Sequence, residues 1–353
     1  MLTIPDIIHH RLINQQIAGT KFTKPEEIVS YMGAMQAQDW AMAKWAIGLR
    51  LPDSKESDFE EAYNAGKILR THVLRPTWHF VTPRDIKWTL QLTAPRVHQL
   101  NKPHYKQFDL DEKVLKKSKD ILIKSLRDKN YKKREELNKE LEKAKIIADR
   151  MRLAYIIMHA ELEGLICSGP RIGKQFSYAL LEEHAPKAVQ MNKQDALHEL
   201  TLKYFKTRGP ATINDFAWWS GLTVKEALEG INSLNKNYLR EKIGSKEYIF
   251  YDLPLMDLKN KRTTFLVPDF DEYGISYKDR SLYQNPKMKV ESSEVHPHFL
   301  HSIVVDGYWG GNWKKSLKGN SYNVEIDPFH SLTKKQLHAI DKSVKRYMDF
   351  FGE

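Results

Sequence analysis

The sequence predicts an α+β fold that is mainly helical and built from groups of helices, each followed by a two-stranded β-ribbon. Apolar residues recur at helical spacing in segments such as 4–17 and 151–164. Pairs of short segments rich in β-branched and aromatic residues follow the helices three times. These pairs are 68–71 with 77–81, 165–168 with 176–180, and 238–242 with 247–251. Helices followed by such a ribbon are the element order of a winged-helix unit.

Size and charge restrict the functions that are open to the chain. Its 353 residues, 41% of them hydrophobic, are enough for two or three domains. The net charge of +11 favours anionic partners, with nucleic acid as the first candidate and an acidic membrane surface as the second. Cys167 is the single cysteine, which excludes an intramolecular disulfide and fits a reducing compartment. We see no signal peptide and no apolar run of the ~20 residues that a membrane helix needs, so we expect a cytoplasmic protein with no membrane partner.

The first predicted unit, residues 1–95, contains the stretch on which the functional prediction depends. Residues 23–26 read as a capping box that opens a helix. Gln36 and Gln38 follow it, one residue apart in an apolar setting, and Asp39 comes directly after them. Further elements of this unit are two strands, 68–71 and 77–81, and a helix over 86–92.

Gln36 and Gln38 are candidates for holding a water molecule or the edge of a base. An amide donates and accepts hydrogen bonds but is neither acid nor base near neutral pH, so the pair is not a proton-transfer dyad. Residues i and i+2 share a face in a strand but lie apart in a helix. Convergence on one water therefore requires an irregular backbone, such as a helix end, which Gly33 favours. The alternative is a pair of ordinary surface amides at a helix terminus.

A basic helical stretch and a second unit follow in residues 96–190. Residues 113–145 carry thirteen Lys and Arg against six Asp and Glu, a local balance of +7. The basic helix face that these residues form is either exposed to solvent without a partner or lies along a phosphate backbone. Arg171 and Lys174 lie in the glycine-rich turn of the second ribbon, which is either a wing along DNA phosphates or an ordinary solvated hairpin. The glycines match no nucleotide-binding loop.

Residues 191–258 contain the clearest helix-turn-helix pattern of the chain. Gly221 marks the turn, and a capping box at 223–226 opens the next helix. Trp218 and Trp219 could stack on bases, although such residues more often belong to the core. A hairpin wing completes the unit.

Short strands separated by Gly, Asp and Asn turns fill much of residues 259–353 and fit a small barrel or sandwich, followed by a final amphipathic helix over 334–351. His296, His298 and His301 raise the question of a metal site. No cysteine lies near them and Pro297 separates the first two, so we expect a surface loop and no metal.

Seven motifs follow one another along nearly the whole chain. They are Gln36-Ala-Gln38, Leu74-Arg-Pro-Thr-Trp-His79, Gly169-Pro-Arg-Ile-Gly-Lys-Gln175, Arg208-Gly-Pro-Ala-Thr212, Phe216-Ala-Trp-Trp-Ser-Gly221, Leu266-Val-Pro-Asp-Phe-Asp-Glu-Tyr273 and Val304-Val-Asp-Gly307. Their order and spacing resemble the AlkZ-type family of winged-helix DNA glycosylases. The resemblance implies three winged helices with a small C-terminal β-barrel, which agrees with the division read from the chain at 1–95, 96–190, 191–258 and 259–353. It also implies excision of alkylated bases, including those in interstrand crosslinks, by a Gln-x-Gln motif.

On this resemblance, Gln36 and Gln38 orient a water that hydrolyses the N-glycosidic bond of an N-alkylated purine, acting by positioning. The cationic purine already leaves well, so no strong general acid is needed. Asp39 either adds electrostatic help or caps the next helix, and we favour the cap. No lysine nucleophile accompanies the motif, so we expect a monofunctional glycosylase without a Schiff base. No cofactor or metal is required.

The expected partner is double-stranded DNA, bound by a monomer. The expected contacts are Arg70, Arg75, Trp78, His79, Arg171 and Lys174. The basic face of residues 113–145 is expected to contribute from outside this set. A non-catalytic winged-helix DNA-binding protein, such as a transcriptional regulator, is the alternative. In a regulator, the helix that begins at Thr223 should dominate the DNA-facing side.

Overall fold

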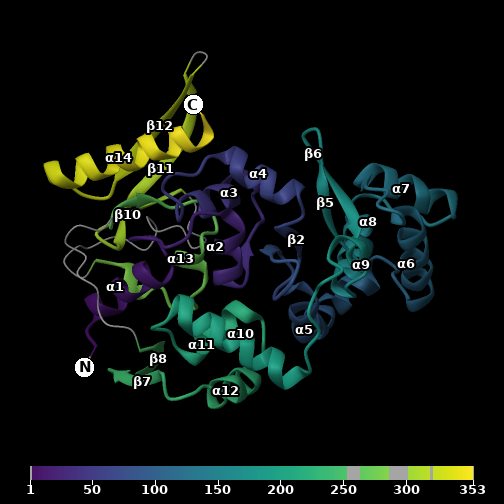
Figure 1. Ribbon diagram of the computed structural model, residues 1–353, viewed down its shortest axis with the longest axis horizontal. Helices are drawn as coiled ribbons and strands as arrows, with labels where there is room; N and C mark the ends of the chain where they lie inside the picture. Colours follow the sequence, from purple (N-terminus) through teal and green to yellow (C-terminus); the bar gives the residue numbers. More distant parts are fainter. Residues whose placement is uncertain (1, 253–262, 286–300, 319–320, 353) are drawn as a thin grey trace. The chain divides into compact units, whose positions relative to one another are not determined.

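The computed structural model describes residues 2–252, 263–285, 301–318 and 321–352. These residues form fourteen α-helices and several small sheets, a mixed and mainly helical fold as predicted (Figure 1). The chain divides into two compact units. Unit 1 comprises residues 1–59, 198–219 and 223–353, and unit 2 comprises 60–197 and 220–222. The predicted division at 95, 190 and 258 remains an interpretation of the element order.

Unit 1 begins with short helices around the strand that carries Gln36. They are α1 (Ile4–Asn14), α2 (Pro25–Met32), β1 (Met35–Gln36) and α3 (Trp40–Gly48), while α4 (Glu56–Asn64) continues into unit 2. The capping box of α2 lies one residue later than predicted, with Lys24 in place of Thr23 as the residue before the helix. The Glu27 carboxylate accepts hydrogen bonds from the backbone N–H groups of Thr23 and Lys24, both at 3.0 Å. The shift arises because Pro25 occupies the first helical position, which places the cap at Lys24.

The predicted helix-turn-helix and its hairpin are present. Their elements are α10 (Lys193–Arg208), α11 (Ile213–Ser220), α12 (Val224–Asn232), β7 (Tyr238–Ile243) and β8 (Lys246–Tyr251). The capping box of α12 is confirmed, because Thr223 Oγ1 accepts from the backbone N–H of Glu226 at 3.2 Å. Trp219 is fully buried whereas 45% of Trp218 is exposed. Of the two tryptophans considered for stacking on bases, Trp219 is therefore a core residue.

The C-terminal strands of unit 1 form an open sheet in the described residues. The elements are β9 (Phe265–Leu266), α13 (Glu272–Ile275), the 3-10 helix η1 (Ser281–Tyr283), β10 (Ser302–Val305), β11 (Tyr308–Lys318), β12 (Ser321–Pro328) and α14 (Lys334–Phe351). The sheet order is β12-β11-β10-β9, with β9 and β12 at its edges. The described part of the chain therefore shows no closed barrel, since the two-residue strand β9 pairs with β10 alone. The helix α14, which Figure 1 shows in yellow, has the predicted bounds and packs on β9.

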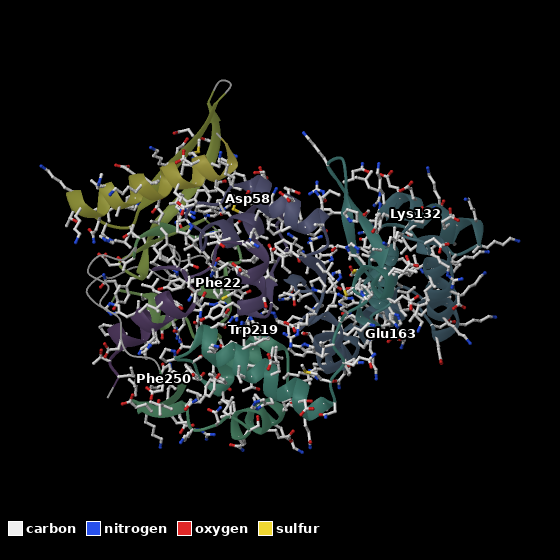
Figure 2. The ribbon with its side chains drawn as sticks, in the orientation of Figure 1. Phe22, Asp58, Lys132, Glu163, Trp219 and Phe250 are labelled. Carbon is white, nitrogen blue, oxygen red and sulfur yellow. The ribbon has the colours of Figure 1, made fainter. Side chains whose placement is uncertain are left out.

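Unit 2 holds two ribbons and the basic helices. Its elements are β2 (Leu69–His72), β3 (Trp78–Val81), α5 (Ile86–Gln107), α6 (Glu112–Leu126), β4 (Lys132–Lys133), α7 (Arg134–Lys143), α8 (Arg150–Leu162), β5 (Ile166–Ile172), β6 (Gln175–Leu180) and α9 (Leu181–His184). The leucines of α6 and α7 join one buried core with α8. The basic residues of 113–145 are all exposed or half-buried, and Figure 2 shows side chains projecting outward from this part of the chain around Lys132.

The helix predicted over 86–92 is longer in the structure. It continues to Gln107 and includes Pro95 and Pro103. A proline inside a helix removes one backbone hydrogen bond and usually ends the helix. Here the apolar face continues past Pro95, because the buried residues Ala94 and Val97 pack with Leu162 of α8. Packing against α8 therefore outweighs the local preference for ending the helix.

Candidate active site and DNA-contact residues

The Gln-Ala-Gln segment has the irregular backbone that two converging amides require. Gln36 ends the short strand β1, and α3 does not begin until Trp40. Burial alternates along the segment: Met35 and Ala37 are buried, whereas Gln36 is half-buried and Gln38 is exposed. Gln36 and Gln38 are therefore the more accessible side chains of the segment, and Ala37 between them belongs to the core of unit 1.

Asp39 caps the helix that follows the motif. Its side chain accepts a hydrogen bond of 2.9 Å from the backbone N–H of Met42. An aspartate at this position satisfies a backbone donor that has no partner within the helix. The preferred interpretation of Asp39 as a helix cap is thus confirmed.

A buried arginine holds the backbone before the motif. Arg208, at the end of α10, donates hydrogen bonds of 2.8 Å to the carbonyl oxygens of Met32 and Ala34. These two residues flank Gly33, whose φ of +77° is rarely adopted by residues with a Cβ atom. The guanidinium therefore fixes the sharp turn between α2 and β1 from both sides.

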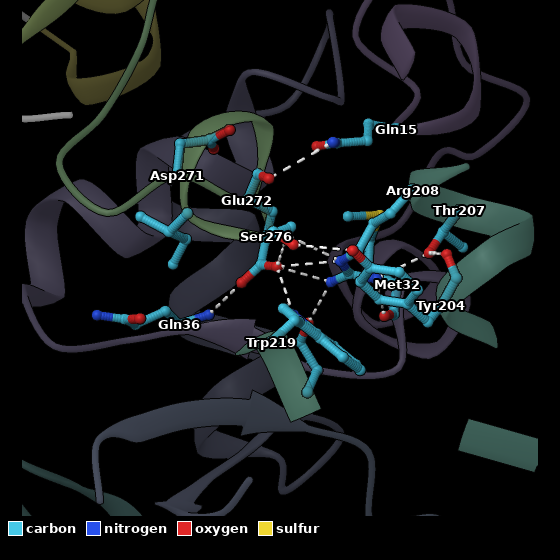
Figure 3. A network of polar contacts seen from close by, with 12 residues as sticks. Gln15, Met32, Gln36, Tyr204, Thr207, Arg208, Trp219, Asp271, Glu272 and Ser276 are labelled. Carbon is cyan, nitrogen blue, oxygen red and sulfur yellow. Dashed lines mark hydrogen bonds and ion pairs between the residues drawn. The ribbon is translucent and has the colours of Figure 1, made fainter. Parts of the chain in front are cut away.

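A buried carboxylate holds the motif itself. Glu272 Oε1 accepts a hydrogen bond of 2.9 Å from the backbone N–H of Gln36, while Oε2 forms an ion pair of 2.8 Å with Arg208. Ser276 Oγ and Trp219 Nε1 also donate to Oε2, at 2.6 and 2.9 Å. Figure 3 shows this network and the Gln36 side chain extending away from the carboxylate. Glu272 is thus the centre of a network that joins α10, α11 and α13 to the Gln-Ala-Gln segment.

The charge of Glu272 is strongly favoured in the folded protein. Burial alone would raise the pKa of its carboxyl group. The Arg208 guanidinium and the hydrogen bonds from Ser276, Arg208 and the Gln36 backbone outweigh burial and lower the pKa to about 2. The carboxylate is therefore ionised at neutral pH and is poorly suited to act as a general acid.

A second buried ion pair lies beside the first. Arg50 binds Asp271 through two hydrogen bonds, of 2.8 and 3.1 Å. Gln15 joins the two pairs, because its Oε1 accepts from Arg50 and its Nε2 donates to the backbone carbonyl of Glu272 at 3.4 Å. Two neighbouring acidic residues are therefore each neutralised by a buried arginine, which makes α13 a rigid support for the motif.

Three of the expected DNA contacts lie together in unit 2. The Arg70 guanidinium stacks on the rings of Trp78 and Phe176, at 4.2 and 4.8 Å from the ring centroids. The Arg171 guanidinium lies on the same Phe176 ring at 4.5 Å. Phe176 was not among the predicted site residues, although it lies in the ribbon next to them. It brings two arginines from different ribbons into one cluster.

The other three expected contacts differ in exposure. Lys174 is exposed at the tip of the β5–β6 ribbon, and Arg75 is half-buried in the turn between β2 and β3. His79 is fully buried, and its Nδ1 lies 2.9 Å from the backbone carbonyl oxygen of Thr77. Burial lowers the pKa of Arg70, of whose surface only 8% is exposed. The two glutamines belong to unit 1 and all six of these residues to unit 2.

Comparison with known proteins assigns the chain to a family. The family model described as "DNA glycosylase AlkZ-like" matches residues 29–350. The chain belongs to the AlkZ-like DNA glycosylase family. It is therefore a DNA glycosylase, an enzyme of DNA repair whose substrate is DNA. No curated protein sequence gives a significant match.

A solved structure has the same fold as this AlkZ-like glycosylase. The DNA glycosylase AlkZ of Streptomyces sahachiroi superposes with a TM-score of 0.80, covering 99% of this chain and 97% of that one. The sequence identity is 16%, at which the likeness establishes the fold alone. In the described part of the chain, no helix has both the length and the apolar character needed to span a membrane.

Sequence reasoning assigned no role to Arg208 and Glu272 of this AlkZ-like enzyme. Both lie in motifs that carried the resemblance, Arg208 directly before Gly209-Pro210 and Glu272 between Asp271 and Tyr273 within a run of aromatic and apolar residues. That pattern signals a buried and paired charge. It does not reveal the partner, since Glu272 and Gln36 are 236 positions apart in the chain.

The expected histidine loop falls largely outside the described residues, which do not include His296 and His298. His301 is described, and its Nδ1 lies 3.3 Å from Asp269 Oδ1. Its side chain is 43% exposed, as expected for a surface loop. The absence of a metal at this loop remains a prediction.

Proposed function

We propose that this AlkZ-like enzyme is a monofunctional glycosylase that removes N-alkylated purines from double-stranded DNA, including purines joined in interstrand crosslinks. Gln36 and Gln38 hold the attacking water. The observation that carries the proposal is the anchoring of the Gln36 backbone N–H by buried Glu272, while the Gln36 side chain extends away from that carboxylate. A fixed backbone is what the positioning of a water requires.

The reaction needs little acid catalysis from the chain. In an N7-alkylated purine the imidazole ring is cationic, so the electron pair of the breaking C1′–N9 bond neutralises the ring and the base leaves uncharged. The water adds to C1′ and loses a proton to solvent, which leaves an abasic site. Gln36 and Gln38 act here as hydrogen-bond acceptors for the water. Asp39 contributes by capping α3, because its side chain is already bonded to the backbone of Met42.

The element order supports a winged-helix interpretation, in which the ribbons of unit 2 bind DNA. In this proposal Lys174 and Arg171 bind phosphates from the β5–β6 ribbon, and Arg75 does so from the β2–β3 turn. Trp78 supports Arg70, whose guanidinium stacks on its ring. A DNA contact by His79, which is fully buried in this structure, remains a prediction. If Z phosphates are neutralised, log affinity falls with log salt at a slope of roughly −0.9Z. We further propose a cytoplasmic monomer.

The proposal is tested by measuring base release and DNA binding side by side. Duplexes that contain 7-methylguanine or a purine crosslink are incubated with excess enzyme, and abasic sites are counted over time. Gln36→Ala and Gln38→Ala should each lower the single-turnover rate by at least roughly tenfold and change DNA affinity far less, because the lost contacts act on the water and the transition state. Exposed Gln107→Ala, on α5, is the matched control and should behave like the wild type.

Two results would count against this mechanism. Equal base release by the wild type and both site variants would mean that the two amides do not position the water. Failure of the wild type to release any alkylated or crosslinked purine would mean that the substrate class is wrong.

A further inference from the structure

Two histidines and a glutamate converge in unit 2, on residues that the glycosylase mechanism does not use. His98 lies on α5, His159 on α8, and Glu163 directly follows the last residue of α8. One ring nitrogen of each histidine and one carboxylate oxygen all lie within 4.8 Å of one another. His159 and Glu163 are four positions apart, which places them on one face of the helix. The third side chain comes from a different helix that packs on α8.

The outer atoms of the cluster are held so that the inner atoms face one another. His98 Nδ1 lies 2.9 Å from the Tyr105 hydroxyl, and Lys119 Nζ donates to Glu163 Oε2 at 3.1 Å. This leaves His98 Nε2 and Glu163 Oε1 facing each other at 3.3 Å, without the alignment of a hydrogen bond. His159 Nδ1 is buried and has no hydrogen-bond partner among the described residues. Fixing the outer atoms of ligand side chains in this way is typical of metal sites.

We propose that His98, His159 and Glu163 bind one Zn²⁺ ion. Two imidazoles and a carboxylate with a fourth position for water are a ligand set that zinc adopts in proteins. With zinc–ligand distances of about 2.0–2.2 Å, tetrahedral ligand atoms lie about 3.4 Å apart. His98 Nε2 and Glu163 Oε1 already have that spacing at 3.3 Å. The His159 ring nitrogen lies within 4.8 Å of both atoms, and binding of the ion would draw it to the same spacing.

A cavity beside the cluster has room for the fourth ligand. It has a volume of about 380 Å³, and its lining includes His98, Glu163, Lys87 and Gln91. One water occupies about 30 Å³ in the liquid, so the cavity admits a water or a small anion as well. The ion would join α5 to α8 and stabilise unit 2. This site is independent of Gln36 and Gln38 and does not rest on the proposed reaction.

The test uses the full-length protein, stripped of metal with a chelator that is then removed. Zn²⁺ is titrated in competition with a chromophoric chelator, and bound zinc is counted by elemental analysis. We expect one equivalent to bind, with an affinity that falls at least tenfold in His98→Ala, His159→Ala and Glu163→Gln. His104→Ala removes an exposed histidine of the same helix α5 and should leave binding unchanged. Binding that persists in His98→Ala, or the absence of a saturable equivalent in the wild type, would overturn the proposal.

A measurement on the wild type alone keeps the proposal testable if a variant fails to fold. X-ray absorption at the zinc edge of the protein with one equivalent of Zn²⁺ should show two imidazole ligands and oxygen ligands at about 2.0–2.2 Å. Fewer than two imidazoles would exclude this site. Thermal unfolding should also shift upward on adding Zn²⁺ to the wild type and not on adding it to His159→Ala, because an ion that binds only the folded state stabilises it.

Discussion

Glu272→Gln tests whether the buried ion pair behind the Gln-Ala-Gln motif stabilises unit 1. The substitution keeps the shape of the side chain and a carbonyl oxygen that can still accept from the Gln36 backbone. It removes the negative charge that faces Arg208 at 2.8 Å, in a place where neither side chain is exposed by more than 1%. The variant therefore leaves a buried guanidinium without its carboxylate, while most contacts of the segment remain in place.

Two routes give the same magnitude for this loss. The pKa of Glu272 falls from 4.5 to about 2 on folding. At 1.36 kcal/mol per pKa unit, this corresponds to about 3 kcal/mol in favour of the charged form. Removal of one partner from a buried ion pair typically costs about 3–5 kcal/mol. Since domains are stable by roughly 5–15 kcal/mol in total, we expect unit 1 to lose a large part of its stability.

The assay is urea unfolding followed by tryptophan fluorescence, which reports on unit 1 through the buried Trp45, Trp219 and Trp313. Glu229→Gln, at an exposed position of α12, is the control and should change stability by at most about 0.5 kcal/mol. The double variant Arg208→Met with Glu272→Gln should be more stable than the sum of the single effects predicts, because it leaves no unpaired charge. Equal stability of Glu272→Gln and Glu229→Gln would refute the reasoning.

Three further predictions concern the same segment. The folded pKa of Glu272 lies below its unfolded value, so the stability that its charge provides should be complete above about pH 4.5 and be lost as pH falls toward 2. Acid titration of the wild type and of Glu272→Gln should therefore show that the stability of the variant depends less on pH. Asp39→Ala should cost about 1 kcal/mol in thermal unfolding through loss of the cap on Met42, while single-turnover base release below the melting temperature stays within about threefold; a far larger fall would assign Asp39 an electrostatic role in the reaction. Gly33→Ala should cost roughly 1–2 kcal/mol in urea unfolding, because its φ is +77° and the added Cβ would lie 3.1 Å from Lys203 Cδ; unchanged stability would mean that this turn relaxes freely.

The sequence by itself determined features that depend on neighbouring residues. The helix over 334–351, the capping box at Thr223 and the hairpin around Gly244 were predicted and are present. Asp39 was also assigned correctly as a cap. Each of these rests on hydrogen bonds or side-chain periodicity within a few residues, so the pattern that specifies the element is contiguous in the chain.

Some local predictions failed where packing from elsewhere took over. The helix predicted over 86–92 continues to Gln107 because its apolar face packs on α8 despite Pro95. The predicted barrel is an open sheet in the described residues, because pairing between edge strands is set by chain segments that are far apart. Periodicity indicates that a segment is a helix or a strand, but it carries no information on which distant segment will cover it.

The candidate site shows the same division. The two glutamines and their spacing are visible in the sequence, and so is the resemblance that gives them a role. The partners that hold them are not, because Glu272 and Arg208 reach this segment from positions 236 and 174 residues away in the chain. Two charges can be buried at low cost only when each meets the other in the right geometry. That meeting is a property of the tertiary structure, which alone decided that an acidic residue beyond β9 fixes the backbone of Gln36.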